Sequence, residues 1–348
     1  MKDFNIHTLT RNNIKDMQSY SSARDEYNDV TGEMVFLDAN ENPFNTGVNR
    51  YPDPQQTSLK AEISKIKNIA VNQILLGNGS DEVIDLVFRA FCEPNKDQVI
   101  TLPPTYGMYE VLAHLNAVEV LKIELDLNFQ PKVDSILEGQ NHNTKLLFLC
   151  SPNNPTSNSF RAESIYKLIS EFKGIVVIDE AYIDFSEDES WIHKLEEFPN
   201  LIVIQTLSKA YGMAGIRLGI CYASEAIISI LNRIKPPYNI NILTQQKALE
   251  RLLNPETVSN EIRTITQQRD WLFSELKSIP CIKNVYPSDA NFLLVKVDDA
   301  TKRYQELIDK EIVVRNRTNQ PLCHNCLRFT IGTTSENIKL ITVLKTLS

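Results

Sequence analysis

Short apolar runs alternate with amphipathic stretches of helical spacing from about Val71 onwards, which is the pattern of an α/β domain with a largely parallel sheet. The runs at 146–149 and 175–178 are apolar on both faces, as in central strands that helices cover on each side. We predict strands at 98–102, 118–123, 145–150, 175–179, 201–206 and 218–222, and helices at 80–91, 107–115, 161–172, 225–233, 244–253 and 256–279.

The pattern changes after Pro236 and Pro237, which interrupt it and mark an exit from the sheet domain. The order that follows indicates a smaller α+β unit: two helices, strands at 282–286 and 292–296, a helix at 301–310, strands at 312–315 and 327–331, and a closing helix from Ser335. We therefore divide the chain into a polar N-terminal arm (1–30), a large domain (31–238) and a small C-terminal domain (239–348).

The amino-acid composition limits the kinds of molecule that the protein is expected to bind. The 348 residues include 36 Lys and Arg against 44 Asp and Glu, a net charge of −8, which argues against a general nucleic-acid binder. No segment approaches the roughly 20 apolar residues of a membrane helix, and the first residues lack the apolar part of a signal peptide. We therefore expect a cytoplasmic protein without membrane contact, whose cysteines are mostly buried free thiols.

Polar side chains follow three of the predicted strands. Asn154 comes after the strand at 145–150, Asp179 and Tyr182 end the strand at 175–179, and Lys209 follows the strand at 201–206. Ligands of open α/β sheets bind at this edge. Asp179 and Lys209 either form a direct ion pair or hold a cofactor between them. Pyridoxal phosphate needs this combination, a lysine that forms a Schiff base and an acid for the pyridinium nitrogen.

A candidate phosphate site lies at the start of the helix at 80–91. Gly79 permits close backbone approach, and the free N–H groups of a helix start bind anions. The Gly-x-Gly pattern alone is weak and completes neither the dinucleotide nor the Walker motif. Thr206, Ser208 and Arg217 are further candidate donors, although Arg217 alone is equally compatible with a surface arginine.

Taken together, these motifs resemble the fold-type I pyridoxal-phosphate aminotransferases. Ser-Pro-Asn-Asn-Pro-Thr, Val-Val-Ile-Asp-Glu-Ala-Tyr, Thr-Leu-Ser-Lys and Gly-Ile-Arg-Leu-Gly occur in that family's order and spacing. The stretches at 37–43, 50–54, 313–317 and 327–333 are most similar to the branch that acts on histidinol phosphate. Ser157 and the loop after Pro321 depart from the family, which often has glycine there. The resemblance implies a mostly parallel seven-stranded sheet sandwiched by helices, a smaller α+β domain and a homodimer.

The resemblance also implies roles for individual residues. Lys209 would form the Schiff base and then move the substrate proton, while Asp179 keeps the pyridine nitrogen protonated. Tyr182 and Asn154 would hydrogen-bond the phenolic oxygen of the cofactor. The implied cofactor-binding residues are Gly79, Ser80, Asp81, Tyr106 (stacked on the ring), Asn154, Asp179, Tyr182, Thr206, Ser208, Lys209, Arg217 and, across the dimer interface, Tyr51. The implied substrate-binding residues are Tyr20, Asn40, Tyr51, Arg315 and Arg328, of which Arg328 clamps a carboxylate or phosphate.

The implied reaction passes the amino group of glutamate to imidazole acetol phosphate and yields 2-oxoglutarate and histidinol phosphate, a step of histidine biosynthesis. Alternatives on the same fold are a threonine-phosphate decarboxylase, an aromatic-amino-acid aminotransferase and a binding protein without activity. The presence of Lys209 with Asp179 and Tyr182 argues against the last of these. Cys323, His324 and Cys326 offer at most three ligands, so we expect no metal site.

Overall fold

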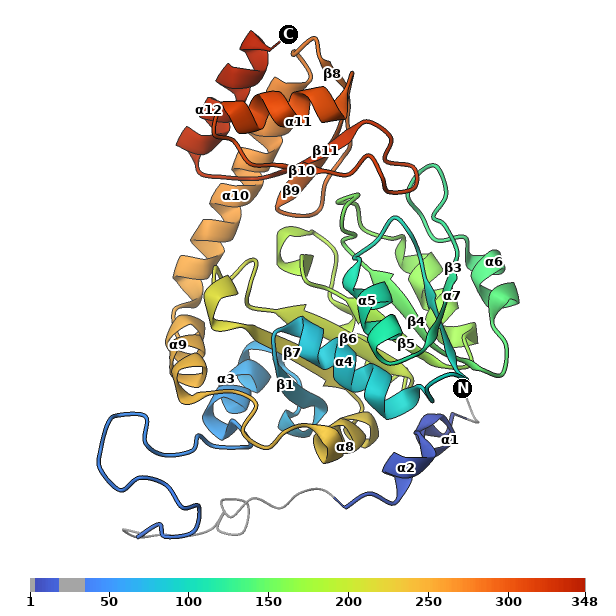
Figure 1. Ribbon diagram of the computed structural model, residues 1–348, viewed down its shortest axis with the longest axis vertical. Helices are drawn as coiled ribbons and strands as arrows, with labels where there is room; N and C mark the ends of the chain where they lie inside the picture. The colour runs from blue at the N-terminus through green and yellow to red at the C-terminus, as the bar shows by residue number, and fades with distance from the viewer. Residues whose placement is uncertain (1–3, 19–34, 348) are drawn as a thin grey trace.

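Two β-sheets organise the protein in the computed structural model, which describes residues 4–18 and 35–347 (Figure 1). The larger sheet contains β1 (Ile74–Asn78), β2 (Gln98–Thr101), β3 (Glu119–Lys122), β4 (Thr144–Cys150), β5 (Ile175–Asp179), β6 (Leu201–Thr206) and β7 (Leu218–Ala223). The smaller one contains β8 (Ile282–Val285), β9 (Phe292–Val297), β10 (Arg315–Asn316) and β11 (Cys326–Thr330). The helices are α1 (Ile6–Leu9), α2 (Asn12–Lys15), α3 (Thr57–Lys67), α4 (Ser80–Phe91), α5 (Met108–Leu115), α6 (Val133–Gly139), α7 (Ala162–Glu171), α8 (Glu225–Ile234), α9 (Ile242–Leu252), α10 (Pro255–Leu276), α11 (Ala300–Asp309) and α12 (Thr334–Thr346).

The larger sheet has the strand order β1-β7-β6-β5-β4-β2-β3, and β7 alone runs against its neighbours. The strands from β6 through β3 are parallel, which confirms the mostly parallel seven-stranded sheet. The register aligns the strand ends, because Asp179 pairs with Cys150 on β4 and Thr206 pairs with Gly219 on β7. The carboxyl ends of the central strands therefore meet at one edge, where the side chains that follow them gather.

Successive residues of each central strand pack into the hydrophobic cores on opposite faces of the larger sheet. Leu146 and Phe148 of β4 pack with α4, α5 and α8, whereas Leu147 and Leu149 pack with α3, α7 and α9. Burial on both faces explains why this strand lacks the hydrophobic-polar alternation of a half-exposed strand. Helices on both sides enclose the sheet (Figure 1), as the sequence predicts.

The antiparallel smaller sheet, in the order β10-β11-β9-β8, packs against α10, α11 and α12. One predicted strand is displaced, because strand pairing is confined to Arg315–Asn316 and does not include 312–314. Glu311 has φ of 60°, and the N–H of Ile312 donates to the carbonyl oxygen of Leu307. Glu311 and Ile312 thus close the C-terminal turn of α11, and the apolar run begins inside this capping turn before the strand starts at Arg315.

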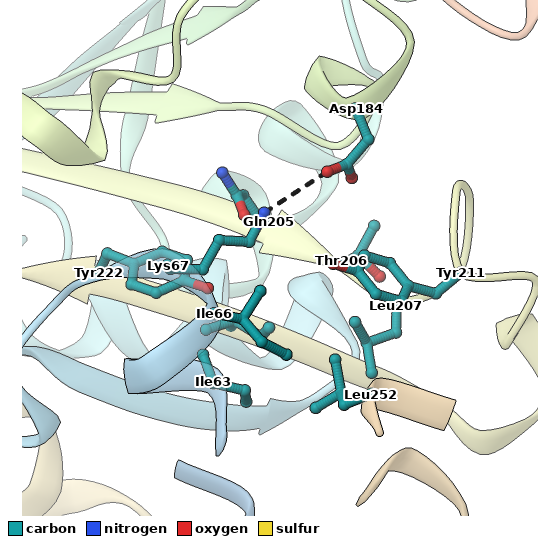
Figure 2. Close-up of a pocket in the computed structure, with 11 residues that line it drawn as sticks. Ile63, Ile66, Lys67, Asp184, Gln205, Thr206, Leu207, Tyr211, Tyr222 and Leu252 are labelled. Carbon is teal, nitrogen blue, oxygen red and sulfur yellow. Dashed lines mark hydrogen bonds and ion pairs between the residues drawn. The ribbon is translucent and has the colours of Figure 1, made fainter. Parts of the chain in front are cut away.

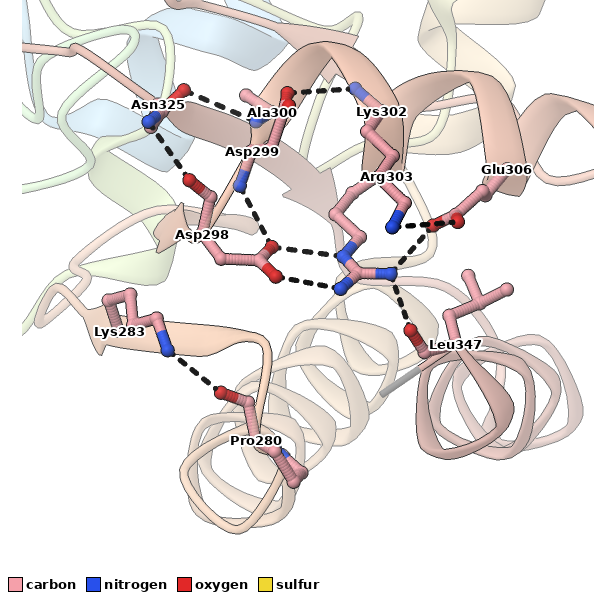
Figure 3. Close-up of polar contacts among 10 residues, drawn as sticks. All are labelled: Pro280, Lys283, Asp298, Asp299, Ala300, Lys302, Arg303, Glu306, Asn325 and Leu347. Atoms are coloured by element: carbon pink, nitrogen blue, oxygen red, sulfur yellow. Dashed lines mark hydrogen bonds and ion pairs between the residues drawn. The ribbon is translucent and has the colours of Figure 1, made fainter.

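Arg303 of α11 fastens several parts of the small unit (Figure 3). Its Nε and Nη2 donate to the two carboxylate oxygens of Asp298 at 2.9 and 2.7 Å. Nη1 donates to Glu306 at 2.8 Å and also to the carbonyl oxygen of Leu347, close to the C-terminus. The hydrogen bonds from Arg303 lower the pKa of Asp298 to about 2. The bidentate pairing with Asp298, together with the hydrogen bond to Leu347, joins the start of α11 to the end of α12.

Helix α3, which we did not predict, packs beside the larger sheet through Leu59 and Ile63 and carries a part-buried ion pair at its end (Figure 2). Lys67, its last residue, places Nζ 3.4 Å from Oδ1 of Asp184 in the short 3₁₀ turn Ile183–Phe185. Asp184 thus takes part in an internal ion pair that stabilises the loop after β5. Within residues 4–18 and 35–347, no helix has the length and apolar character needed to cross a membrane.

Candidate active site

A cavity of about 510 Å³ opens at the carboxyl ends of the central strands and extends to the smaller sheet. Twelve of the residues predicted from the sequence line it: Ser80, Asp81, Tyr106, Asn154, Asp179, Tyr182, Thr206, Ser208, Lys209, Arg217, Arg315 and Arg328. Segments far apart in the sequence thus meet in one concave site, as the common strand edge predicts.

Asp179 is the buried acid of the cavity. The hydroxyl group of Tyr109 donates to its Oδ2 at 2.6 Å, and the N–H of Ala181 donates to its Oδ1 at 3.1 Å. Burial raises the pKa of Asp179, while the hydrogen bond from Tyr109 acts in the opposite direction. Tyr109 was absent from the predicted site; it lies in the first turn of α5, close in sequence to Tyr106, which precedes the helix.

Lys209 faces the same cavity without an ion-pair partner among the residues that the structure describes. Burial of its amine and the positive charge of Arg328 lower the pKa of Lys209, and the charge of Asp179 offsets part of this effect. Its Nζ lies 5.7 Å from the centre of the Tyr182 ring. The direct Asp179–Lys209 ion pair, the simpler of the two sequence interpretations, is therefore not formed.

Tyr182, Asn154 and Arg328 form a connected polar wall. Nδ2 of Asn154 donates to the hydroxyl oxygen of Tyr182 at 3.4 Å, and Nη1 of Arg328 donates to Oδ1 of Asn154 at 2.5 Å. The guanidinium carbon of Arg328 also lies 5.1 Å from the centre of the Phe292 ring. Burial raises the pKa of Tyr182, while the charge of Arg328 lowers it. A phenol next to a cation can hydrogen-bond an oxyanion.

The opposite end of the cavity is suited to an anion. Gly79 precedes α4 with φ of 82°, and a Cβ there would lie 2.6 Å from Nη2 of Arg217. Glycine therefore lets the arginine approach the helix start. The hydroxyl oxygen of Thr206 lies 3.0 Å from that of Ser208, and both line the cavity. Helix N–H groups, hydroxyl groups and a guanidinium group form a cup of donors.

Tyr106 and Asp81 lie beside this cup. The hydroxyl group of Tyr106 donates to Oδ1 of Asp81 at 3.0 Å, and Nη2 of Arg217 lies 3.6 Å from the other oxygen of Asp81. Tyr109 packs edge-on against Tyr106, with ring centres 5.5 Å apart. Tyr106 is thus held from both ends, its ring by Tyr109 and its hydroxyl by Asp81. This arrangement is compatible with an aromatic ligand stacking on Tyr106.

The smaller sheet contributes arginine residues. Arg315 and Arg328 are paired across β10 and β11, and Arg317 also lines the cavity. Arg317 was not among the predicted residues, although it lies in the stretch at 313–317 that is similar to the histidinol-phosphate branch. Residues two apart in an extended segment point to the same side, and that spacing was the available signal.

Some predicted residues lie elsewhere in the single chain. Tyr51 is about half exposed and stacks on Tyr238, with ring centres 4.5 Å apart, and it does not line the cavity. Asn40 is an exposed residue with φ of 53° in the segment that precedes α3. Tyr20 lies outside the described residues.

The chain is similar to known proteins along its whole length. Residues 25–344 match the family of class I and II aminotransferases. The chain is 64% identical to the histidinol-phosphate aminotransferase of Flavobacterium johnsoniae, over 100% of both chains. Its fold is similar to that of the histidinol-phosphate aminotransferase of Clostridium acetobutylicum, with a TM-score of 0.80, 26% identity and coverage of 86% of this chain and 91% of that chain. It is also similar to the Sinorhizobium meliloti enzyme of that name, solved in complex with pyridoxal 5′-phosphate, with a TM-score of 0.77, 20% identity and coverage of 86% and 84%.

Proposed function

The chain belongs to the family of class I and II aminotransferases, and on this premise we propose that it is the aminotransferase of histidinol phosphate in histidine biosynthesis. It transfers the amino group of glutamate to imidazole acetol phosphate, and the products are 2-oxoglutarate and histidinol phosphate. The observation that carries the proposal is that Lys209 and Asp179 line the same cavity without forming an ion pair with each other.

The cofactor of this reaction is pyridoxal 5′-phosphate, and the cavity has a suitable group for each part of it. The cradle beside Gly79, which a Cβ would fill, suits the phosphate, with Ser80, Thr206, Ser208 and Arg217 as donors. Tyr106 provides a ring for stacking, and Asp179 is an acid for the pyridine nitrogen. Bound there, the cofactor supplies a reactive aldehyde and an electron-withdrawing ring.

Each residue of the chain then has a defined task. The lowered pKa of Lys209 favours its neutral amine, which can attack a carbonyl carbon and accept a proton from the substrate carbon. Tyr109 holds the carboxylate of Asp179 in place. Asn154 and Tyr182 present a donor pair at the wall that Arg328 supports. Arg328 and Arg315 bind the anionic end of the substrate.

We also propose that the enzyme is a homodimer in which Tyr51 reaches the partner's cofactor phosphate. Val35, Leu37 and Phe44 are 81%, 88% and 77% exposed in the segment before Tyr51 (Figure 1), which supports an interface with a second chain. Glu41 holds this segment through Nη1 of Arg50 at 2.6 Å and the N–H of Tyr51 at 2.6 Å. The six cysteines are free buried thiols, which favours the reducing cytoplasm.

The test is an amino-transfer assay with purified protein loaded with pyridoxal phosphate. Imidazole acetol phosphate should be the preferred acceptor over aromatic 2-oxo acids, and threonine phosphate should release no carbon dioxide. Lys209→Ala should abolish transfer, while Lys302→Ala, an exposed lysine on α11, should leave it unchanged. Preference for an aromatic acceptor, or decarboxylation of threonine phosphate, would overturn the proposal.

A further inference from the structure

The cavity has more positive charge at its small-sheet end than the proposed tasks require. Arg315, Arg317 and Arg328 all line it there. The ion pair at the other end joins Arg217 to Asp81, but within residues 4–18 and 35–347 no carboxylate lies at ion-pair distance from these three arginines. Like charges gathered at one wall repel one another, so the arrangement is one that a bound anion completes.

Arg317 is a fixed part of this wall. Its N–H donates to the carbonyl oxygen of Cys326 at 2.9 Å, and its own carbonyl oxygen accepts from the N–H of Gln320 at 2.9 Å. Its side-chain Nε is buried without a hydrogen-bond partner among the described residues, and the same holds for Nε of Arg328. Buried donors without partners are costly, so these two point to a ligand with several acceptor oxygens.

The electrostatics agree with this geometry. Burial lowers the pKa of Arg317 and the neighbouring charge of Arg315 lowers it further. Burial and the charge of Arg317 lower the pKa of Arg328 to about 10. The guanidinium groups of Arg317 and Arg328 are thus in settings that disfavour their own charge, and an anion of high charge relieves both together.

The two substrates of the proposed reaction differ in this respect. A phosphate monoester carries a charge of about −1.5 to −2 at neutral pH and has three acceptor oxygens, whereas each carboxylate of glutamate carries one charge on two oxygens. We propose that Arg317 is a specificity-determining residue that binds the phosphate group of the phosphate-ester substrate, an inference that rests on the proposed function. Arg315 and Arg328 then serve both substrates, and Arg317 distinguishes them.

A different task for Arg317 would leave a different kinetic signature. Its charge also acts on Tyr182, whose pKa it lowers. A residue that acted only through Tyr182 would change the rate of proton transfer, and it would change kcat with glutamate and with histidinol phosphate alike. A residue that binds the phosphate group changes KM for the phosphate ester alone.

The experiment measures the two half-reactions separately in the cofactor-loaded enzyme, with glutamate and with histidinol phosphate as amino donors. Arg317→Gln should raise KM for histidinol phosphate about tenfold or more, as the loss of a charge-assisted hydrogen bond implies, and KM for glutamate less than about threefold, with kcat retained. Arg263→Gln, an exposed position on α10, removes the same charge away from the cavity and should change neither KM.

The outcomes separate this inference from the proposed function. Equal increases in both KM values, or a loss of kcat with both donors, would overturn the inference alone. A wild-type enzyme that accepts glutamate but not histidinol phosphate would overturn the proposed function and the inference with it. If Arg317→Gln does not fold, Arg317→Lys carries the test, because lysine keeps the charge without the planar fork. An unchanged KM for histidinol phosphate in a folded Arg317→Lys enzyme would also overturn the inference.

Discussion

The hydroxyl group of Tyr109 lies 2.6 Å from Oδ2 of Asp179 and donates a hydrogen bond to it, while the Tyr109 ring belongs to the core between α5 and the larger sheet. Both side chains are almost fully buried, and the Tyr109 ring stacks on Phe148 with ring centres 4.8 Å apart. Burial raises the pKa of Asp179, and the hydrogen bond from Tyr109 is the largest of the effects that oppose this rise.

Tyr109→Phe should reduce kcat/KM for both amino donors about tenfold or more, because a charge-assisted hydrogen bond to a buried carboxylate is lost. The pKa of Asp179 should rise further, so activity on the acid side should be lost at a higher pH than in the wild type. The pH dependence of kcat checks this, together with the affinity of the cofactor-free protein for pyridoxal phosphate.

Tyr222→Phe is the matched control for that change. Tyr222 is also fully buried, but its hydroxyl group has no hydrogen-bond partner among the described residues. Both substitutions remove one buried hydroxyl group, and only the one at Tyr109 affects Asp179. Equal behaviour of the two variants would contradict the assigned task of Tyr109.

Arg328→Gln should raise the pKa of Lys209, because a positive neighbour that disfavours the charged amine is removed. Only the neutral amine attacks an aldehyde, so the curve of capture rate against pH should shift to higher pH. The measurement is the absorbance change when pyridoxal phosphate is added to cofactor-free protein over a range of pH. Arg263→Gln should leave the midpoint in place, and a shift of the Arg328→Gln midpoint to lower pH would refute the explanation.

Homodimers that carry Tyr51→Phe and homodimers that carry Lys209→Ala should each have lowered activity. When the two proteins exchange subunits, part of the activity should return. If Tyr51 serves the partner's site, each mixed dimer has one complete site, and random exchange yields about a quarter of wild-type activity. The measurement is to unfold an equal mixture of the two variants, refold them together and assay the activity. No gain on mixing would show that Tyr51 does not act across an interface.

Arg303→Gln should lower the free energy of unfolding by about 1.5–3 kcal/mol, because charge-assisted hydrogen bonds to Asp298 and Glu306 are lost from a largely buried position. The neighbouring Lys302→Gln removes only an exposed pair at 3.9 Å and should cost at most about 1 kcal/mol. Urea unfolding of the cofactor-free proteins measures both.

The same pair predicts a pH dependence. The pKa of Asp298 is lowered to about 2 in the folded protein from 3.8, so its stabilising effect is present above the unfolded value and disappears as pH falls from about 4 to about 2. The difference in unfolding free energy between wild type and Arg303→Gln should therefore shrink over that interval. A difference that stays constant down to pH 2 would exclude Asp298 as the partner that matters.

The sequence predicted best where a residue follows a buried strand. Asp179 is the last residue of β5 and Lys209 follows β6. Parallel strands bring their carboxyl ends to one edge, so the position of these residues in the sequence determined their position in space. Arg317 and Tyr109 were missed because their contributions depend on which face of a short segment meets the cavity. The end of α11 was misread because its capping turn resembles the apolar run of a strand.

Two predicted site residues and one helix depend on contacts that a local sequence pattern does not reveal. Tyr51 and Asn40 lie outside the cavity of the single chain, so their predicted contacts with cofactor or substrate require the second subunit of the proposed homodimer. Helix α3 was not predicted, although Leu59 and Ile63 are spaced as on one face of a helix and are buried in the core. Its part-buried ion pair, Lys67 with Asp184, joins residues 117 positions apart in the sequence. Local hydrophobic spacing carries no information about such distant partners.

Helix α10 starts beside the larger sheet and continues into the core of the smaller one (Figure 1). Ile262 and Ile265 on it contact the cluster that contains Tyr182, and two turns further on Leu272 and Leu276 support β9. The two sheets share no hydrogen-bonded strand. The helix therefore connects the part of the cavity wall that contains Tyr182 to the core beneath the sheet that carries Arg315 and Arg328.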